Sequence, residues 1–204
     1  MSTPNSPRRA ATRDRLVTAA IPVIAHKGVL GASVEEICEA AGFTRGAFYS
    51  NFDSKDDLCI AILEVLCDRH LTAARTAIDR MDHSLALPER LSQTLQLFIA
   101  TAGEDANTVL VMSELRLYAA REPALRTAFN SFEAGVTPLF AGLMGDGLRS
   151  AGLSLTVPVE QAISLLHAVY DQTALDQLIR GEQPDSPEAA NQLSLVLRSM
   201  LAPT

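Results

Sequence analysis

The stretch SVEEICEAAGFTRGAFYSNF, residues 33–52, decides how this chain folds. Ser33 followed by Glu36 has the spacing of a capping box, which predicts a short helix that begins directly after the serine. Gly42 is suited to end that helix, and Thr44 to cap a second short one. The stretch therefore predicts two short helices joined by a tight turn.

Two helices within twenty residues have the length of a helix-turn-helix motif, whose second helix enters the DNA major groove. The apolar residues predicted to form its core are Val34, Ile37, Ala41, Phe43, Phe48 and Phe52. The residues expected to point outward are Thr44, Arg45, Gly46, Ala47, Tyr49 and Asn51. Arg45 suits a guanine edge or a phosphate, and Ala47 a thymine methyl. An ordinary helical hairpin is the alternative interpretation.

A helix is predicted before this motif, over about residues 11–27, with Gly28 positioned to end it. Pro22 lies inside that helix, where a proline removes a backbone hydrogen bond and clashes with the carbonyl four residues earlier. We therefore expect a kink or an early break at Pro22. The basic N-terminus before this helix, including Arg8 and Arg9, is expected to be a flexible arm.

A long helix is predicted after the motif, because Ser54 and Asp57 form a second capping box and the helical pattern continues to about Met81. Its length suits a connector between two functional units. Lys55, near its first turn, is expected to contact a DNA phosphate.

The remaining chain is also predicted to be helical, and no segment has the alternating pattern of a strand. Glycine and proline separate five further helical segments, with breaks expected at residues 83–88, 103–106, 122–123, 142–147, 152–158 and 181–187. In the last break, Gly181 suits a helix end, Ser186 an N-cap and Pro187 a first helical position. The fold class is therefore all-α, with a three-helix N-terminal head joined by a long helix to a helical body.

The segment GVLGASVEEICEAAGFTRGAFYSNFDSKDDL, residues 28–58, resembles the DNA-binding head of the TetR family of transcriptional regulators. The resemblance rests on S-V-x-x-I-x-x-A-A-G, on T-R-G-A-F-Y and on the following F-x-S-K-x-x-L, and it covers about residues 9–65. It departs at Asn51, where many members carry histidine, and at Pro22, where relatives carry an ordinary helix former. The DNA-binding residues expected from motif and resemblance are Arg9, Ser33, Thr44, Arg45, Gly46, Ala47, Tyr49, Asn51 and Lys55.

The resemblance implies a flexible arm over residues 1–8, a DNA-binding domain over 9–65, and an effector-binding and dimerisation domain over 66–204. It implies a homodimer that binds near-palindromic operator DNA, most commonly as a repressor released by a small effector. Apolar and polar residues between the fifth and eighth helices suggest an effector pocket with Phe98, Met112, Arg116, Tyr118, His167 and Tyr170. Apolar faces of the last two helices suggest a dimer interface with Ile163, Leu166, Tyr170, Ala174, Leu193, Leu197 and Met200. Burial of these faces inside the monomer is the alternative.

Composition sets limits on other functions. The chain has 204 residues, of which 48% are hydrophobic and 20% are charged, as expected for a globular protein. Its net charge is −7, yet residues 1–58 hold seven basic and seven acidic residues, so the acidic excess lies in the body. No apolar stretch is long enough for a bilayer, and no secretory signal is recognised. Three cysteines without a C-x-x-C pair favour the cytoplasm.

The sequence offers no catalytic or metal-binding constellation. It lacks G-x-S-x-G, G-x-G-x-x-G, a Walker loop and H-E-x-x-H, and its four histidines have no ligand spacing. We therefore expect neither an enzyme, nor a cofactor, nor a metal site. The competing hypothesis is a helical protein-interaction module whose helix-turn-helix does not bind DNA.

Overall fold

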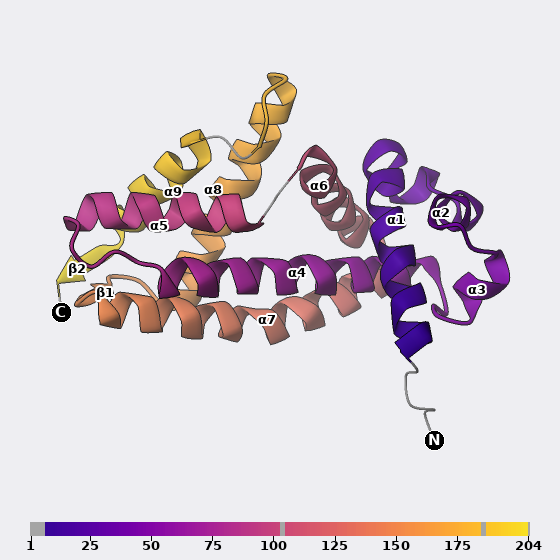
Figure 1. The fold of residues 1–204 in the computed structure, drawn as a ribbon, viewed down its shortest axis with the longest axis horizontal. Coiled ribbons are helices and arrows are strands. Elements are labelled where there is room, and N and C mark those ends of the chain that lie inside the picture. The colour runs from indigo at the N-terminus through magenta and orange to yellow at the C-terminus, as the bar shows by residue number, and fades with distance from the viewer. Residues whose placement is uncertain (1–6, 103–104, 185–186, 204) are drawn as a thin grey trace. The chain divides into compact units, whose positions relative to one another are not determined.

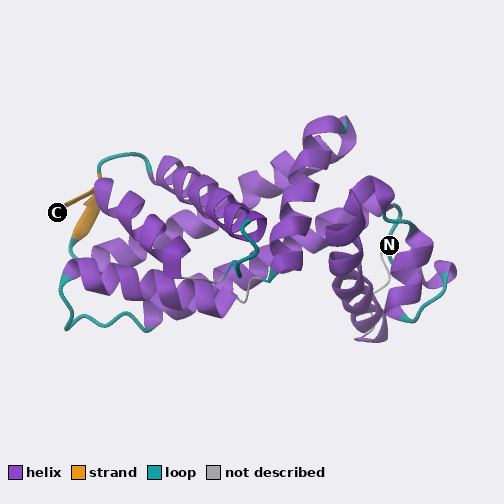
Figure 2. Cartoon of the chain, turned by 90° about the horizontal axis from the view of Figure 1, so that it is seen from above, coloured by secondary structure: helices purple, strands orange, loops and turns teal. Residues whose placement is uncertain are grey.

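The computed structural model describes residues 7–102, 105–184 and 187–203, and most of these residues are helical (Figures 1 and 2). The helices are α1 (Pro7–Gly31), α2 (Val34–Ala41), α3 (Arg45–Tyr49), α4 (Lys55–Asp79), α5 (Leu87–Ala102), α6 (Ala106–Arg121), α7 (Pro123–Ser150), α8 (Val159–Ile179) and α9 (Pro187–Ser199). The predicted all-α class is confirmed. No helix in the described part of the chain is long and apolar enough to cross a membrane.

Two short strands were not predicted from the sequence. β1 (Leu153–Leu155) pairs antiparallel with β2 (Leu201–Pro203), and Ser154 lies opposite Ala202. Each strand is three residues long, so neither shows the alternation that identifies a strand locally. The pair forms because the segments that follow α7 and α9 meet in the fold.

The first helix is longer than predicted and passes through Pro22. Gly28 is its one residue with non-helical backbone angles, with φ of 72° and ψ of 163°. The break expected at Pro22 is therefore wrong, whereas Gly28 interrupts the helix as predicted. Leu16, Ala20 and Ile24 on the same helix are fully buried, and this burial offsets the unfavourable proline.

The break expected at residues 142–147 is also wrong, because α7 continues through all three glycines of this stretch. A Cβ atom added to Gly147 would lie 3.5 Å from the side chain of Ile78 on α4. Close packing at this position offsets the low helix propensity of glycine, which is about 1 kcal/mol. At the later break, Pro187 opens α9 and Gly181 has a positive φ, as predicted, whereas Ser186 lies outside the described residues.

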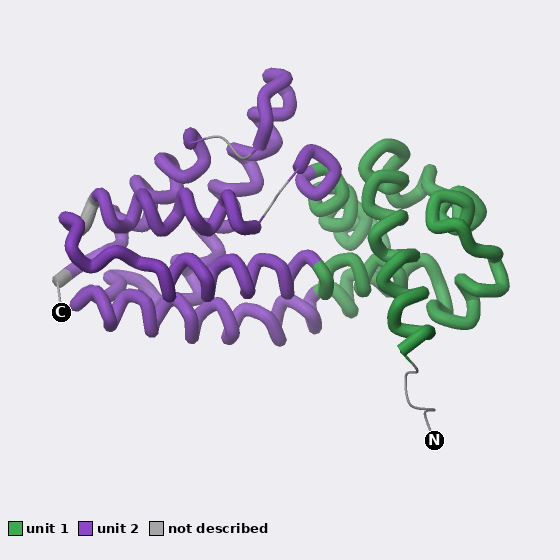
Figure 3. The backbone as a smooth tube through the Cα atoms, viewed as in Figure 1, with its two compact units in different colours: residues 1–65, 110–129 green, residues 66–109, 130–204 purple. Residues whose placement is uncertain are grey.

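The chain forms two compact units (Figure 3). Unit 1 consists of Met1–Val65 and Leu110–Phe129, and unit 2 of Leu66–Val109 and Asn130–Thr204. One boundary between the units lies between Val65 and Leu66, and unit 1 also includes Leu110–Phe129 from later in the chain. Of the predicted arm, residues 1–6 lie outside the described chain, and Pro7 and Arg8 belong to α1.

Candidate nucleic-acid interface and apolar cavity

The start of α2 is held by the predicted capping box. The Ser33 hydroxyl accepts the Glu36 N–H at 3.2 Å, and the Glu36 carboxylate accepts the Ser33 N–H at 3.0 Å. Lys27, from the end of α1, forms an ion pair with the same carboxylate. The hydrogen bond from Lys27, followed by those from Ser33, lowers the pKa of Glu36 from 4.5 to about 2. The ionised glutamate therefore ties α1 to α2.

The turn between α2 and α3 needs a left-handed residue, and Gly42 supplies it with φ of 71° and ψ of 35°. Its N–H donates to Glu39 O at 3.0 Å, and Phe43 N–H donates to Cys38 O at 2.8 Å. Thr44 then caps α3, because its hydroxyl accepts the Ala47 N–H at 3.3 Å. The turn predicted from glycine and threonine is thus confirmed in detail.

Two aromatic rings form the base of α3. Phe48 and Phe52 are at most 1% exposed, and their ring centroids lie 5.5 Å apart. Two arginines of α1 pack against the motif, Arg13 at this base and Arg15 at the end of α2. The Arg13 guanidinium lies 4.5 Å from the Phe52 ring centroid, and Arg15 donates to Ala41 O at 2.9 Å. Of the predicted core, Ile37 and Ala41 are also buried, whereas Val34 and Phe43 are half-buried.

The opposite side of α3 is exposed at Thr44, Arg45, Gly46 and Tyr49, and Ala47 is half-buried. Arg45 Nη1 lies 2.5 Å from Glu35 Oε1, and Arg45 Nη2 donates to the Tyr49 hydroxyl at 3.5 Å. The hydrogen bond with Tyr49 is the first cause that raises the pKa of Arg45 above its usual value, and the negative charge of Glu35 is the second. This face therefore offers hydroxyl groups and one permanent cation.

Two residues expected on this face have other partners. Asn51 points inward, with Nδ2 donating to Ala47 O at 2.7 Å and Oδ1 buried without a hydrogen-bond partner among the described residues. Lys55 Nζ donates to Val29 O at 2.6 Å and to Ala32 O at 3.0 Å. Gly28 interrupts α1, and the Lys55 ammonium supplies hydrogen-bond donors to these two backbone carbonyls, which follow the interruption.

The other two predicted contact residues lie on unit 1 outside α3. Arg9 is exposed in the first turns of α1. Ser33 is half-buried, and its hydroxyl also donates to Glu36 at 2.9 Å. Its hydrogen-bonding groups are therefore used within the capping box.

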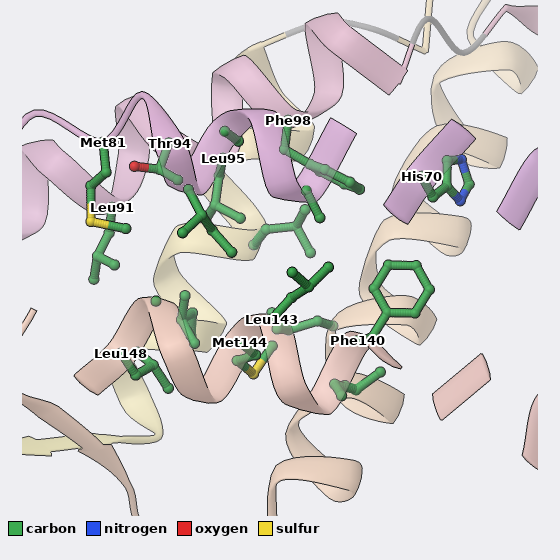
Figure 4. Close-up of a pocket in the computed structure, with 18 of the residues that line it drawn as sticks. His70, Met81, Leu91, Thr94, Leu95, Phe98, Phe140, Leu143, Met144 and Leu148 are labelled. Atoms are coloured by element: carbon green, nitrogen blue, oxygen red, sulfur yellow. The ribbon is translucent and has the colours of Figure 1, made fainter. Parts of the chain in front are cut away.

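An apolar cavity of about 200 Å³ lies within unit 2. Its walls come from α4, α5, α7, α8 and α9, and its described lining contains no Asp, Glu, Lys or Arg. Figure 4 places Met81, Leu91 and Leu148 toward one end and His70 and Phe140 toward the other. An apolar or amphipathic small molecule is the kind of ligand that such a lining suits.

The cavity matches the expected pocket in part. Phe98, His167 and Tyr170 line it, whereas α6 contributes none of its described lining residues, so Met112, Arg116 and Tyr118 do not. Tyr118 instead belongs to unit 1, where its hydroxyl donates to Asp56 at 3.1 Å. The sequence reasoning missed the wall from α4. The small residues Ala74 and Ala77, one turn apart, were the available signal, because they leave space beside the helix.

The residues expected at a dimer interface are mostly buried within unit 2. Tyr170, Ala174, Leu193, Leu197 and Met200 are at most 8% exposed, and Ile163 and Leu166 line the cavity. Most of this set thus packs within unit 2, whereas Ile163 and Leu166 are half-buried. The large apolar side chains that α8 and α9 leave exposed are Leu165, Ile179 and Leu195, at 43%, 76% and 64%.

In the described residues, no group of three or more His, Cys, Asp or Glu side chains is placed to hold a metal ion. Cys38, Cys59 and Cys67 are buried free thiols. Burial is the first cause that raises the pKa of Cys59 to about 12 and that of Cys67 to about 11. These thiols are therefore protonated and act as small apolar core residues.

Comparison with known proteins gives concordant matches. Residues 16–62 match the family described as "Bacterial regulatory proteins, tetR family". The regulator YwcC of Bacillus subtilis is 39% identical over 28% of this chain, and that match spans only 26% of YwcC. The transcriptional repressor BepR of Brucella suis is 26% identical over 95% of this chain and 94% of the BepR sequence.

Solved structures share the whole fold. The regulator FadR of Bacillus subtilis, in complex with stearoyl-CoA, superposes with a TM-score of 0.71 at 21% identity, over 92% of this chain and 98% of FadR. Both the motif and the helical body thus have counterparts in regulators of one kind, and residues 16–62 carry the DNA-binding segment of the TetR family of transcriptional regulators.

Proposed function

We propose that this protein is a homodimeric repressor that binds a near-palindromic operator through α3 and leaves it when a small apolar or amphipathic effector occupies the cavity of unit 2. The observation that carries the proposal is the two-sided structure of α3. Phe48 and Phe52 anchor one side, and Thr44, Arg45 and Tyr49 are exposed on the other. A recognition helix needs such a rigid base and such a polar outer face.

The exposed residues have distinct expected roles at DNA. Thr44 and Tyr49 donate to phosphate oxygens, and Arg45 reaches a guanine edge or a phosphate. Gly46 and Ala47 allow close approach, and Arg9 adds a cation at the start of α1. The DNA-binding domain then corresponds to residues 9–65, and residues 66–204 carry effector binding and dimerisation.

Roles at DNA for Ser33, Asn51 and Lys55 are less direct. All three hold backbone or side-chain partners within unit 1, so we expect them to fix the position of α3 and its neighbours. Substitution of Lys55 would then weaken DNA binding through misplaced helices as well as through lost charge.

The cavity lining supports an effector that is uncharged where it is buried. An ionised group in this cavity would lose its hydration without finding an Asp, Glu, Lys or Arg among the described lining residues. The solved FadR structure contains stearoyl-CoA, and a long acyl chain fits the same chemical preference. Of the pocket residues expected from the sequence, Phe98, His167 and Tyr170 line the cavity and are the proposed effector contacts.

Helix α4 is the proposed link between effector and DNA. Its first half carries Leu58 and Ile62, which are fully buried in unit 1, and its second half carries Ala77 and Ile78 of the cavity wall. A ligand that favours a shifted α4 changes the spacing of the two recognition helices in the dimer. Operator DNA must then weaken effector binding by the same factor.

A dimer contact needs apolar side chains that the monomer leaves exposed. We propose the outer faces of α8 and α9, with Leu165, Ile179 and Leu195, because large apolar side chains on a surface are typical of such contacts. Two heads held in this way reach half-sites separated by about 10 base pairs or a multiple of that spacing.

The first test is a salt titration of binding to duplex DNA from directly upstream of the protein's own gene, beside a scrambled duplex. Tight, salt-sensitive binding to the native duplex, weakened by Tyr49→Ala, supports the proposal. Leu117→Ala is the matched control, since Leu117 on α6 is 51% exposed and Tyr49 is 50% exposed. Equal weak binding to both duplexes, and no sequence selected from a random library, would favour the protein-interaction module instead.

The effector is tested with a straight-chain alcohol and the carboxylate of the same length. We expect the alcohol to weaken operator binding and the carboxylate to act less, because the described lining holds no Lys or Arg to pair with a carboxylate. Leu143→Trp, which fills the cavity, should abolish the response. Leu139→Trp places the same side chain one turn earlier on α7, where Leu139 is 54% exposed, and should leave it intact. An unchanged response in Leu143→Trp would rule out this cavity.

A further inference from the structure

The exposed cation of α3 is held by an acidic residue of α2. Arg45 Nη1 and Glu35 Oε1 lie 2.5 Å apart, and the two side chains are 59% and 55% exposed. Glu35 lies in the first turn of α2, and Arg45 is the first residue of α3. The ion pair therefore joins the two helices on the side where the motif meets solvent.

Tyr49 fixes the same guanidinium from another direction. Its hydroxyl lies 3.5 Å from Arg45 Nη2, and its ring centroid lies 5.7 Å from the Arg45 Cζ atom. A guanidinium has five N–H donors in a rigid plane. Two of its nitrogens are engaged by Glu35 and Tyr49, so the remaining donors keep a defined direction.

Other cations near the motif are committed to the protein. Arg15 donates to Ala41 O, Lys55 to Val29 O and Ala32 O, and Lys27 pairs with Glu36. Within α3, Arg45 is the sole cation, and its partner is a carboxylate that any approaching phosphate would meet. DNA must therefore compete with Glu35 for this guanidinium, or share it.

We propose that Glu35 is a specificity-determining residue of the DNA interface, which restrains Arg45 from binding phosphates of any sequence and presents its free donors to one base edge of the operator. The inference rests on the proposed operator-binding function. On unrelated DNA, Arg45 gains a phosphate only by leaving a carboxylate, and that carboxylate repels the phosphate. At the operator, Arg45 keeps its partner and donates through its remaining N–H groups.

The variant Glu35→Gln, which replaces the carboxylate with an uncharged amide of the same size, separates these two situations. It frees Arg45 to reach phosphates and removes one negative charge from the interface. We expect affinity for a scrambled duplex to rise about two- to fivefold, as an exposed ion pair allows, and the salt slope on that duplex to steepen by about one. Operator affinity should change less than about twofold, because lost orientation opposes reduced repulsion, so the specificity ratio falls.

Glu39→Gln is the matched control. Glu39 is exposed on the same helix, its side chain has no partner among the described residues, and its substitution changes the net charge equally. It should raise affinity for both duplexes by the same small factor. Circular dichroism of both variants checks that α2 and α3 remain folded.

The experiment uses the full chain and an operator selected by the wild-type protein from a random library of duplexes of about 30 base pairs, long enough for two half-sites. A fall in the specificity ratio for Glu35→Gln alone supports the proposal. If the wild type discriminates between duplexes and Glu35→Gln behaves as Glu39→Gln, the role of Glu35 is overturned while the proposed function stands. If the wild type selects no sequence, the proposed function fails, and this inference with it.

Discussion

The helix-turn-helix and the apolar cavity are built in opposite ways. The former is completed by neighbours in sequence, since Ser33 bonds to Glu36 and Thr44 to the Ala47 N–H. The cavity instead needs five helices that extend from His70 to Leu197. One region is fixed by short-range chemistry and the other by how distant helices meet. Rigidity is thus concentrated where DNA is expected, and free space where a ligand is expected.

The packing of the two regions differs accordingly. Phe48 in α3 is fully buried, whereas Phe98 in α5 is half-buried, lines the cavity and stacks edge-on with His70 at 6.2 Å. A ring that borders empty space has fewer atoms in contact, so it contributes less to the free energy of unfolding. The cavity therefore lowers local stability in exchange for binding capacity.

The largest expected difference between the regions is the effect of removing these two rings. Phe48→Ala should lower the free energy of unfolding by about 3–5 kcal/mol, because it leaves a new void in a packed core. Phe98→Ala should lower it by about 1–2 kcal/mol, since part of its ring already faces the cavity. Urea titrations followed by circular dichroism measure both values. Equal losses would show that the cavity is collapsed in solution.

Helix capping offers a second, smaller comparison. Ser33→Ala removes the acceptor for the Glu36 N–H and should cost about 1 kcal/mol. Ser164→Ala replaces an exposed serine inside α8 and should stabilise slightly, by about 0.5 kcal/mol, because alanine is the better helix former. Thermal melts of the two variants should therefore shift in opposite directions. A loss of stability in both would indicate that Ser164 has a role that its exposure does not suggest.

The segment of α6 within unit 1 gives a third test. Tyr118→Phe removes the donor to Asp56 and should cost about 0.5–1.5 kcal/mol. The control Tyr49→Phe removes an exposed hydroxyl and should change stability less. Hydrogen exchange of α6 and of the start of α4 should speed up together in Tyr118→Phe. Faster exchange in α6 alone would mean that this segment is not anchored to unit 1.

Sequence reasoning identified the motif well because its determinants are local. The capping box at Ser33, the left-handed Gly42 and the cap at Thr44 depend on residues at most four positions away. Lys55 was assigned to DNA because nothing nearby revealed its partners, which lie 23 and 26 residues earlier at the end of α1. A lysine has the same sequence signature whether it meets a phosphate or a carbonyl, so these two bonds could not be predicted.

The body was harder to predict because its features depend on which helix faces meet. Helical spacing placed Leu193 and Leu197 on one apolar face of a helix. It did not show whether that face packs within the chain or against a second copy. The strands β1 and β2 are joined across 48 residues, as the bond from Ser154 to Ala202 O shows. Glycines 142 and 147 signalled a break that packing of α7 against Ile78 overrides. Local patterns carry none of this information.

The smallest expected effect concerns the pH dependence of the α1–α2 connection. The folded protein lowers the pKa of Glu36 from 4.5 to about 2, chiefly through Lys27 and then Ser33, so the folded state binds fewer protons than the unfolded state below about pH 5. The stabilisation is therefore complete above the unfolded pKa and is lost as the pH falls from 4.5 towards 2. Glu36→Gln keeps an acceptor for the Ser33 N–H but cannot ionise, so it lacks this stabilisation at neutral pH.

The melting temperatures of wild type and Glu36→Gln should thus differ most near about pH 7 and converge only as the pH falls to about 2. Glu39→Gln removes an equal charge from the same helix without touching Lys27 or Ser33, and should follow the wild-type profile. A gap between wild type and Glu36→Gln that persists at low pH would mean that the glutamate acts by its shape alone. Convergence would show that the rigid region too depends on one exposed charge, since the tie from α1 to α2 is ionic whereas the base of α3 is aromatic.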